Sequence, residues 1–208
     1  MGMDLIEKAT IMHYHRHRLS ICRDGTVEAL GWRGADSQLK RFAALATVVD
    51  SVSRFTGATL LDLGCGYGDL KGYLDRGCSG FTYIGIDQMA EFIAEARQRY
   101  QDCANTWFYQ SDFTRVDFPE VDYVLASGAL GYRCANPEFY TGMLRKMYGA
   151  ARRALAFNML DAARFPEHPL LVGHDPDAIV SFCQTLSPSV RLLRGYLEDD
   201  FTVLVYRE

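Results

Sequence analysis

The sequence predicts an α/β fold, in which helices cover a mostly parallel β-sheet. From residue 59 onward, short aliphatic or β-branched runs alternate with amphipathic segments, as is typical of parallel strands joined by helical crossovers. The last two runs are separated by only three residues, 198–200, which is too short for a helical crossover. We therefore expect five strands linked by crossovers, followed by an antiparallel hairpin.

Seven apolar runs are the candidate strands, and four amphipathic segments are the candidate helices. The last helix has a clear local start, because Asp175 can cap it and Pro176 suits its first turn. The strands are expected at residues 59–63, 82–87, 106–110, 121–127, 153–159, 191–197 and 201–207. The helices are expected at residues 68–77, 89–100, 137–150 and 175–186.

Residues 1–56 precede this pattern, and we expect them to form a helical arm or lid against the sheet. Their first half is polar and irregular. Their second half carries an apolar stripe at helical spacing, which predicts a helix capped by Asp36 or Ser37. We place a boundary after residue 56 and treat residues 57–208 as one domain. The stripe consists of Leu39, Phe42, Ala43, Leu45, Ala46 and Val49.

Composition excludes several classes of protein. The 208 residues are 49% hydrophobic, which is ordinary for a soluble domain, and a net charge of -4 lacks the basic excess of most nucleic-acid binders. No apolar run approaches the roughly 20 residues that span a bilayer. The six cysteines form no CxxC pair, and no signal-peptide pattern opens the chain. We therefore expect a cytoplasmic protein with reduced thiols and no membrane attachment.

A glycine-rich turn, LLDLGCGYGDL at residues 60–70, follows the first strand and opens a helix. Such a turn lets a ligand approach main-chain N–H groups at the positive end of the helix dipole. In a dinucleotide-binding fingerprint the third glycine would fall on Asp69, so a pyrophosphate is disfavoured here. A tight turn without any ligand is the simpler alternative when this stretch is considered alone.

Two aspartates at the ends of the next strands favour a nucleoside ligand. Asp87 ends the second strand, where a carboxylate can accept hydrogen bonds from both hydroxyls of a ribose. Asp112 follows the third strand and is placed for an adenine edge, with Phe113 available to pack on the ring. Each aspartate alone is more commonly a cap or turn residue, but together they outline one adenosine.

These motifs resemble those of the class I S-adenosylmethionine-dependent methyltransferases over residues 57–207. The matching segments are LLDLGCGYGD, YIGIDQMAEFIAEAR, QSDF and VDYVLASGAL. The resemblance implies a Rossmann-like three-layer sandwich, a seven-stranded sheet with an antiparallel C-terminal strand, and S-adenosyl-L-methionine as cofactor. Residues 31–45, 157–161 and 195–207 are also similar to a group of small bacterial methyltransferases of undefined substrate.

The resemblance assigns cofactor-binding roles to the matching positions. It implies that the turn glycines line the methionine and ribose moieties, with Asp62 near the amino group. Asp87 would bind the ribose hydroxyls and Asp112 the adenine amino group, while Ser127 and Gly128 would border the methyl group. The full candidate set is Asp62, Gly64, Cys65, Gly66, Gly68, Asp87, Gln88, Asp112, Phe113, Ser127 and Gly128.

The acceptor pocket is expected beyond the carboxyl ends of the strands, where ligands bind in open α/β sheets. Arg133 could hold a carboxylate or phosphate with its planar fork, or it could be an ordinary surface arginine. Three residues of the arm, Trp32, Gln38 and Arg41, could close the pocket. Alternatively, Trp32 could belong to the core and Arg41 could be a solvent-exposed helix residue. The candidate catalytic residues are Tyr132 and Arg133 after the fourth strand, Asn158 after the fifth beside Asp161, and Tyr67 within the glycine turn.

The run HYHRHR places three histidines at alternate positions, so an extended segment would present His13, His15 and His17 on one face. A metal site would need outer partners and a further ligand that the sequence does not indicate, and we predict no metal. Three roles for this run remain open: a lid that contacts an acidic substrate, a catalytic base, or an exposed arm without a direct role.

We expect methyl transfer from S-adenosylmethionine to an oxygen or nitrogen atom of a small molecule, which would be an acidic one if Arg133 binds it. Transfer from a sulfonium depends mainly on alignment and desolvation of the acceptor, so the lack of a catalytic triad does not argue against an enzyme. The fourth strand ends in ASGA instead of the Asn/Asp-Pro-Pro-Tyr/Phe tetrapeptide of many nucleic-acid amine methyltransferases. Alternatives are a non-catalytic or partner-dependent cofactor-binding protein, an RNA or protein methyltransferase, and a nicotinamide-dependent oxidoreductase.

Overall fold

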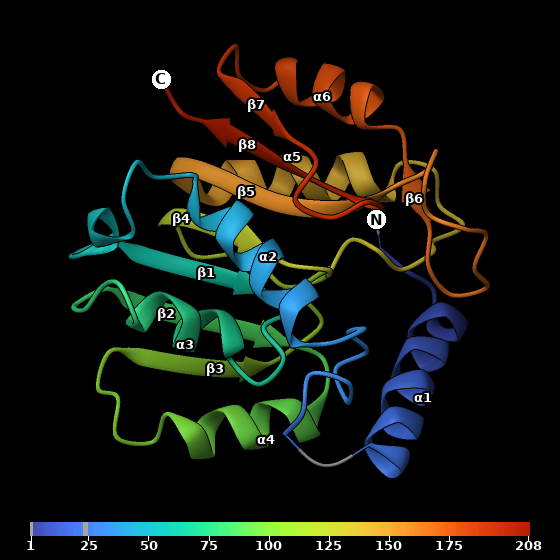
Figure 1. The fold of residues 1–208 in the computed structure, drawn as a ribbon, viewed down its shortest axis with the longest axis horizontal. Coiled ribbons are helices and arrows are strands. Elements are labelled where there is room, and N and C mark those ends of the chain that lie inside the picture. The colour runs from blue at the N-terminus through green and yellow to red at the C-terminus, as the bar shows by residue number, and fades with distance from the viewer. Residues whose placement is uncertain (1, 23–24) are drawn as a thin grey trace.

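The fold is a twisted central sheet with helices on both faces (Figure 1), as the sequence predicts. The structure is a computed structural model that describes residues 2–22 and 25–208. On one face lie α2 (Ala35–Ala46), the short 3-10 helix η1 (Val52–Phe55), α3 (Asp69–Asp75) and α4 (Ala90–Arg99). On the other face lie α5 (Phe139–Ala150) and α6 (Pro176–Gln184). Each face therefore buries its own apolar cluster against the sheet.

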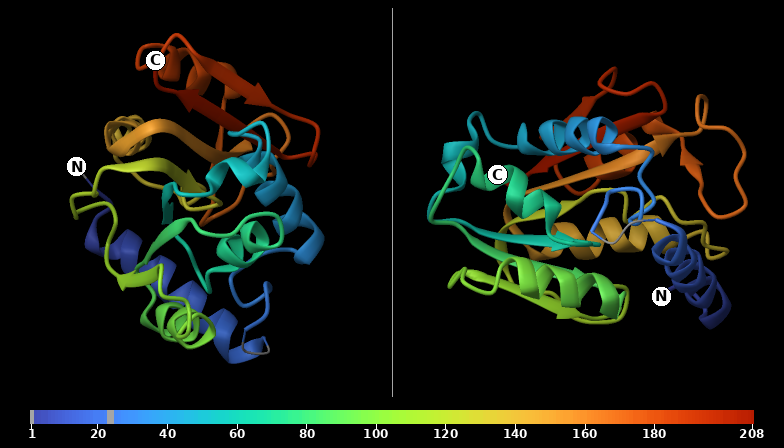
Figure 2. Two further views of the ribbon diagram at one scale, coloured as in Figure 1. Left: turned by 90° about the vertical axis from the view of Figure 1, so that its left-hand side faces the viewer. Right: turned by 60° about the horizontal axis from the view of Figure 1, so that its bottom comes forward.

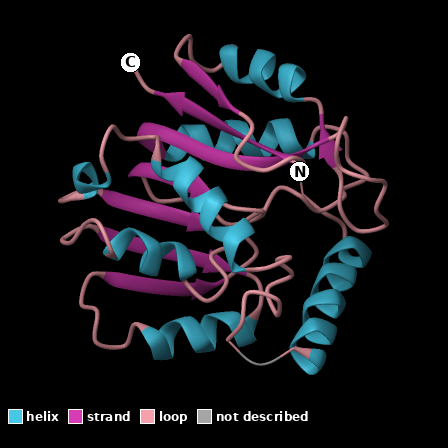
Figure 3. Ribbon diagram, viewed as in Figure 1, coloured by secondary structure: helices cyan, strands magenta, loops and turns pink. Residues whose placement is uncertain are grey.

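The strand order is β3-β2-β1-β4-β5-β8-β7. The first five strands run parallel, and β8 runs antiparallel to both β5 and β7, which confirms the predicted terminal hairpin. Figure 3 shows how the helices alternate with these strands. The strands are β1 (Thr59–Leu63), β2 (Thr82–Asp87), β3 (Thr106–Gln110), β4 (Val121–Ala126), β5 (Ala151–Asp161), β7 (Val190–Leu193) and β8 (Asp200–Tyr206).

Two differences from the sequence prediction concern the last third of the chain. The strand expected at 191–197 ends at Leu193, because the chain leaves the sheet there for the loop that leads to β8. An eighth strand, β6 (Gly173–His174), pairs parallel with the end of β5. Two residues are too few to produce a periodic pattern, so no sequence signal marks β6.

The N-terminal arm is helical. The first helix, α1 (Leu5–Ile21), begins with a capping box in which Asp4 and Glu7 bond each other's main-chain amides. Two of its residues are buried, Ile11 and His15, which explains why no amphipathic pattern reveals it. The second helix, α2, begins after Gly34, so the caps predicted at 36 and 37 are wrong and both residues lie within its first turn. Whether the arm ends at residue 56, as predicted, stays a prediction.

The arm lies at the end of the sheet where ligands bind. Figure 1 shows α1 beyond the carboxyl ends of β1, β2 and β3, and two further views show the same arrangement (Figure 2). None of the helices in the described part of the chain is long and apolar enough to cross a membrane. The arm and the strand ends together enclose the functional site.

A buried ion pair joins α2 to the last strand. Nε of Arg41 lies 2.7 Å from a carboxylate oxygen of Asp200, and their side chains are 10% and 2% exposed. The Tyr196 hydroxyl also donates a hydrogen bond to Asp200. Removing one member of such a pair leaves an uncompensated buried charge, which costs more than the intact pair contributes.

We expect Arg41→Met to lower the free energy of unfolding by about 3 kcal/mol, because it leaves Asp200 buried without its cation. Urea denaturation at neutral pH measures this loss. The double variant Arg41→Met/Asp200→Asn is the matched control and should recover most of it. Equal losses in the single and double variants would show that the ion pair does not anchor α2.

Candidate active site

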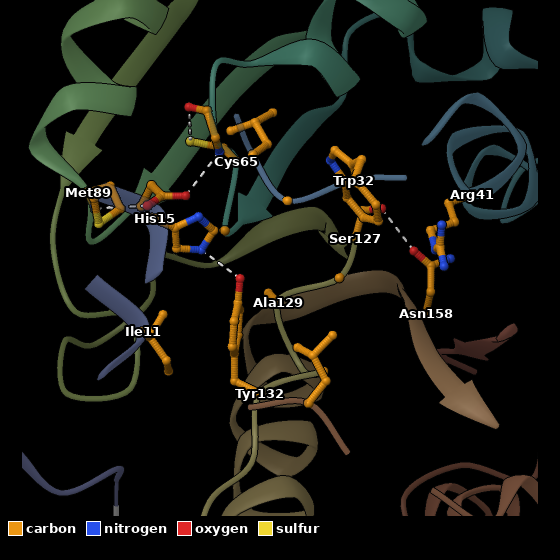
Figure 4. Close-up of a pocket in the computed structure, with 18 of the residues that line it drawn as sticks. Ile11, His15, Trp32, Arg41, Cys65, Met89, Ser127, Ala129, Tyr132 and Asn158 are labelled. Atoms are coloured by element: carbon orange, nitrogen blue, oxygen red, sulfur yellow. Dashed lines mark hydrogen bonds between the residues drawn. The ribbon is translucent and has the colours of Figure 1, made fainter. Parts of the chain in front are cut away.

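A pocket opens where the carboxyl ends of β1 to β5 meet the arm (Figure 4). Its walls come from α1, residues 30–42, the glycine turn and the loops after β2 to β5. All of the predicted cofactor-binding residues except Gly68 line it. The parallel topology thus brings together side chains that lie more than 60 residues apart in the sequence.

The glycine turn is shaped by close packing against the rest of the protein. Gly64, Gly66 and Gly68 have left-handed backbones with φ of 72°, 54° and 77°, which favour glycine. A Cβ atom on Gly68 would lie 2.8 Å from ring atoms of Phe108 and Tyr100. Gly68 does not line the pocket and packs on its neighbours, so its predicted contact with the ligand stays a prediction.

Two buried carboxylates face the pocket beside this turn. Asp87 accepts hydrogen bonds from the amides of Gly66, at 3.0 Å, and Met89, at 2.9 Å. Asp62 accepts one from the Tyr83 hydroxyl. The two aspartates are 8% and 2% exposed, and neither takes part in an ion pair within the described residues.

Burial dominates the protonation of both groups. It raises the pKa of Asp62 to about 7, against the lowering effect of the Tyr83 hydrogen bond, and the nearby Asp87 charge raises it further. Burial likewise raises the pKa of Asp87 to about 6, although three backbone amides favour its charged form. Buried carboxylates that lack a cationic partner suit a ligand that carries positive charge and hydroxyl donors.

Asp112, at the next strand end, is tied to the arm. Its carboxylate lies 2.5 Å from Nζ of Lys8 on α1 and 2.6 Å from the Thr114 hydroxyl. Burial opposes ionisation of Asp112, but Lys8 and Thr114 outweigh it and lower the pKa. Because Phe113 also lines the pocket, α1 closes the end at which the sequence places adenine.

His15 extends from α1 to the far side of the pocket. Its Nε2 lies 2.6 Å from the Tyr132 hydroxyl, and its ring packs edge-on against Phe92. The side chain is buried, with 6% exposed, and its Nδ1 has no hydrogen-bond partner among the described residues. Burial, with a smaller effect from Arg18, lowers the pKa of His15 to about 4, so the imidazole is neutral at pH 7.

The histidine run is therefore not an extended strip with all three rings on one face. In a helix, residues four apart share a face, so His13 and His17 lie together on the exposed side of α1. His15 points the other way, into the pocket. Sequence reasoning missed the special position of His15 because the phase of α1 is set by what the helix packs against.

A chain of hydrogen bonds braces the floor of the pocket. The Ser127 hydroxyl donates to Oδ1 of Asn158 at 2.9 Å, and Nδ2 of Asn158 donates to the Thr202 hydroxyl at 2.8 Å. These bonds connect β4, β5 and β8. Asn158 lines the pocket as predicted, but its amide already serves both neighbouring strands.

The second half of the arm covers the opposite wall. Trp32 packs so closely on Gly128 that a Cβ there would lie 2.7 Å from its ring, and the Arg41 guanidinium stacks on Trp32. The Gln38 amide donates to Asp69 at 2.9 Å. Trp32, Gln38 and Arg41 all line the pocket.

Two predicted catalytic residues lie outside the lining. Tyr132 bridges to Leu171, and because alternate residues of an extended segment face opposite sides, Arg133 points away from the pocket. The Arg133 guanidinium donates to the carbonyls of His168 and Leu171, which braces the loop after β5. Tyr67 is buried behind the glycine turn and packs edge-on against Phe92. Neither Arg133 nor Tyr67 lines the pocket, so their direct role at the acceptor stays a prediction that these positions do not support.

Comparisons with known proteins support one family. A family model described as a methyltransferase domain matches residues 60–154. A predicted methyltransferase of Mycobacterium tuberculosis (strain H37Rv), Rv1506c, is 37% identical over 157 residues, which cover 69% of this chain and 90% of the relative.

Solved structures share the fold at low sequence identity. Magnesium protoporphyrin IX methyltransferase from Synechocystis PCC 6803, with bound S-adenosylhomocysteine, has a TM-score of 0.71 at 16% identity and covers 97% of this chain and 100% of its own. The DhpI-SAM-HEP complex has a TM-score of 0.70 at 17% identity, with both chains covered fully. N-methyltransferase NodS from Bradyrhizobium japonicum WM9 has a TM-score of 0.64 at 15% identity and covers 94% and 97%.

The pocket fits S-adenosylmethionine, which carries an ammonium group, a sulfonium and two ribose hydroxyls. Asp62 and Asp87 are buried carboxylates without a cationic partner in the described part of the chain, and both face the pocket beside the glycine turn. Together with the fold and the sequence relationship, this places the chain in the class I S-adenosylmethionine-dependent methyltransferases, with S-adenosyl-L-methionine as its cofactor.

Proposed function

We propose that the enzyme transfers the methyl group to an oxygen or nitrogen atom of a small molecule. The observation that carries this proposal is the closure of the pocket by the arm, through Lys8 at Asp112, His15 at Tyr132, and Trp32 over Gly128. A pocket closed in this way suits a compact acceptor better than a folded macromolecule. The similar structures include a methyltransferase of magnesium protoporphyrin IX, which is also a small molecule.

Within this proposal, the strand ends position the cofactor. Asp87 accepts hydrogen bonds from the ribose hydroxyls, while Asp112 and Phe113 hold the adenine. Asp62 and the first two glycines of the turn hold the methionine part. When bound, S-adenosylmethionine supplies a methyl group on a positively charged sulfur, whose departure as a neutral thioether needs no acid catalyst. Ser127 and Gly128 border the methyl side.

The rest of the site aligns the acceptor and excludes water. Trp32 and Tyr132 come from different segments and face the same cavity (Figure 4). Desolvation and fixed orientation of the two reacting atoms provide the main rate enhancement in such a transfer. The expectation of an acidic acceptor depended on Arg133, which points out of the pocket, so we do not retain it.

Release of S-adenosylhomocysteine tests the function directly. We expect the wild-type protein to form it in the presence of members of a panel of small phenols, alcohols, amines and acids. Binding of the cofactor without turnover of any acceptor would favour a partner-dependent or non-catalytic protein. Turnover of RNA or protein alone would contradict the proposed substrate class.

Asp87→Ala is expected to weaken S-adenosylmethionine binding by about 3 kcal/mol, the cost of two lost hydrogen bonds to a charged acceptor. Isothermal titration calorimetry measures this change. Asp87→Asn tests the charge with less change in shape, and Asp102→Asn, at an exposed position outside the pocket, is the control. Unchanged affinity in Asp87→Ala would show that this carboxylate does not contact the ribose.

Cofactor affinity should rise with pH. The pKa values of about 7 for Asp62 and about 6 for Asp87 mean that both carboxyls bind protons in the free protein at mildly acidic pH. A cationic ligand favours the ionised form, so binding releases these protons. We expect S-adenosylmethionine affinity to increase on the order of tenfold from about pH 6 to pH 8.

Calorimetry in buffers of different ionisation enthalpy measures the released protons. Asp62→Asn can still accept the Tyr83 hydrogen bond but cannot titrate, so it should lose the part of the pH dependence near pH 7. Affinity that stays constant over this range in the wild-type protein would contradict the protonation of both carboxyls.

A further inference from the structure

One end of the pocket is not used by the proposed cofactor contacts, and we call it the acceptor lobe. It begins beside Gly128, which borders the methyl group in the proposed function and on which the Trp32 ring packs directly. It continues to the end of β5, where Cδ1 of Leu160 lies 3.8 Å from the position of a Cβ atom on Gly131. The walls of the acceptor lobe are Trp32, Tyr132, Leu160, Phe165 and Leu171.

The walls of the lobe leave apolar surface uncovered. All five wall residues are half-buried, although they line a cavity. Trp32 and Tyr132 come from different segments and face this cavity together (Figure 4). A ligand with an aromatic or aliphatic body would remove this surface from water, which is favourable.

An ion pair lies beside these apolar walls. Arg33 follows Trp32 in the chain, and its guanidinium lies 2.8 Å from a carboxylate oxygen of Asp199, in the loop before β8. The main-chain carbonyl of Asp199 accepts a hydrogen bond at 3.0 Å from the amide of Asp161, the residue after Leu160. Because Arg33 and Asp199 both line the pocket, an acceptor in the lobe would meet this pair.

The two members of the pair differ in exposure. The Asp199 side chain is 12% exposed, whereas that of Arg33 is 69% exposed. An ion pair between two exposed groups contributes little to stability, but withdrawing the cation from a buried carboxylate leaves that charge uncompensated. Asp199 therefore holds the Arg33 guanidinium and keeps it from an anionic acceptor.

The other cationic side chains of the pocket are occupied in the same way. Three such side chains line it in the described part of the chain, and each has a carboxylate partner. An acceptor that carried a carboxylate into the lobe would lose its hydration without gaining a free cation. The two pairs besides Arg33 and Asp199 are Lys8 with Asp112 at 2.5 Å and Arg41 with Asp200 at 2.7 Å.

The bound cofactor leaves this balance unchanged. S-adenosylmethionine brings an ammonium and a sulfonium, which in the proposed function compensate the buried carboxylates Asp62 and Asp87. Its own carboxylate adds a negative charge. The pocket with its cofactor thus has no positive charge to offer an anion.

We propose that the acceptor is an uncharged molecule with an aromatic or aliphatic body, and that Asp199 determines this specificity, since it excludes anionic acceptors by occupying Arg33. This inference rests on the proposed function and names its substrate class. The body of the acceptor covers the walls of the lobe, and its oxygen or nitrogen atom lies toward Gly128. That atom forms a bond to the methyl carbon as the bond between this carbon and the sulfonium sulfur breaks, and its proton passes to water.

The first test compares probes that differ in charge but hardly in shape. The pairs are 4-hydroxybenzamide with 4-hydroxybenzoate, 4-aminobenzamide with 4-aminobenzoate, and 6-hydroxy-2-naphthamide with 6-hydroxy-2-naphthoate. Calorimetry measures their binding to the wild-type complex with S-adenosylhomocysteine. In each pair that binds, we expect the amide to bind at least about tenfold more tightly than the carboxylate. A carboxylate that binds as tightly as its amide, or binding of none of the six compounds, overturns the inference.

Release of S-adenosylhomocysteine separates this inference from the proposed function. Turnover of acids alone by the wild-type enzyme overturns the inference and leaves the proposed function intact. Selective binding of the amides without turnover of any small molecule defeats the proposed function and not the selection by charge.

The second test frees Arg33. Asp199→Asn keeps the size of the side chain but removes its charge, so the ratio of amide to carboxylate affinity should fall at least about tenfold. Asp177→Asn is the matched control, because it frees Arg194 from an ion pair of the same 2.8 Å length whose members do not line the pocket. This control should keep the wild-type ratio.

The double variant Arg33→Gln/Asp199→Asn shows whether the freed cation causes the change. It removes both charges, so its ratio should return to within about threefold of the wild type. An unchanged ratio in Asp199→Asn, or a double variant that keeps the altered ratio, would overturn the role of Asp199. The affinity for S-adenosylhomocysteine checks the fold of each variant, and the comparison of probes in the wild-type protein does not depend on the variants.

Discussion

The hydrogen bond from the Gly66 amide to the Asp87 carboxylate is the contact on which the site depends. It joins the glycine turn after β1 to the end of β2, at 3.0 Å, while the second oxygen of Asp87 holds the amide that starts the next helix. One carboxylate thereby holds together the two strand ends that line the pocket. The left-handed glycines allow the turn to come this close.

The site carries buried negative charge that the protein itself does not neutralise. Asp62 and Asp87 lie in the pocket without cationic partners in the described part of the chain, whereas Asp112, Asp199 and Asp200, which also line it, are paired with arm residues. Burial of such groups is unfavourable for the ligand-free fold. In the proposed binding mode, the cationic cofactor supplies the missing charge, so that stability which the free protein gives up contributes to cofactor affinity.

The arm completes the site from outside the motif region. α1 reaches both ends of the pocket, at Asp112 through Lys8 and at Tyr132 through His15, and α2 is held to β8 by the Arg41 ion pair. The matched family region begins at residue 60, so the residues that would choose the acceptor lie largely outside it. We therefore propose that selection of the acceptor depends largely on residues outside the matched region.

The sequence by itself determined the parallel sheet, the terminal hairpin and the placement of pocket-lining residues at the strand ends. Each of these follows from a local pattern: the alternation of apolar runs with amphipathic segments, the length of the last loop, and the spacing of the glycines. Tertiary packing alone decided that His15 turns inward, that Arg133 turns outward and that Tyr67 is buried behind the turn. The rotation of a helix or bridge about its own axis depends on the surface that it packs against, and no single segment contains that information.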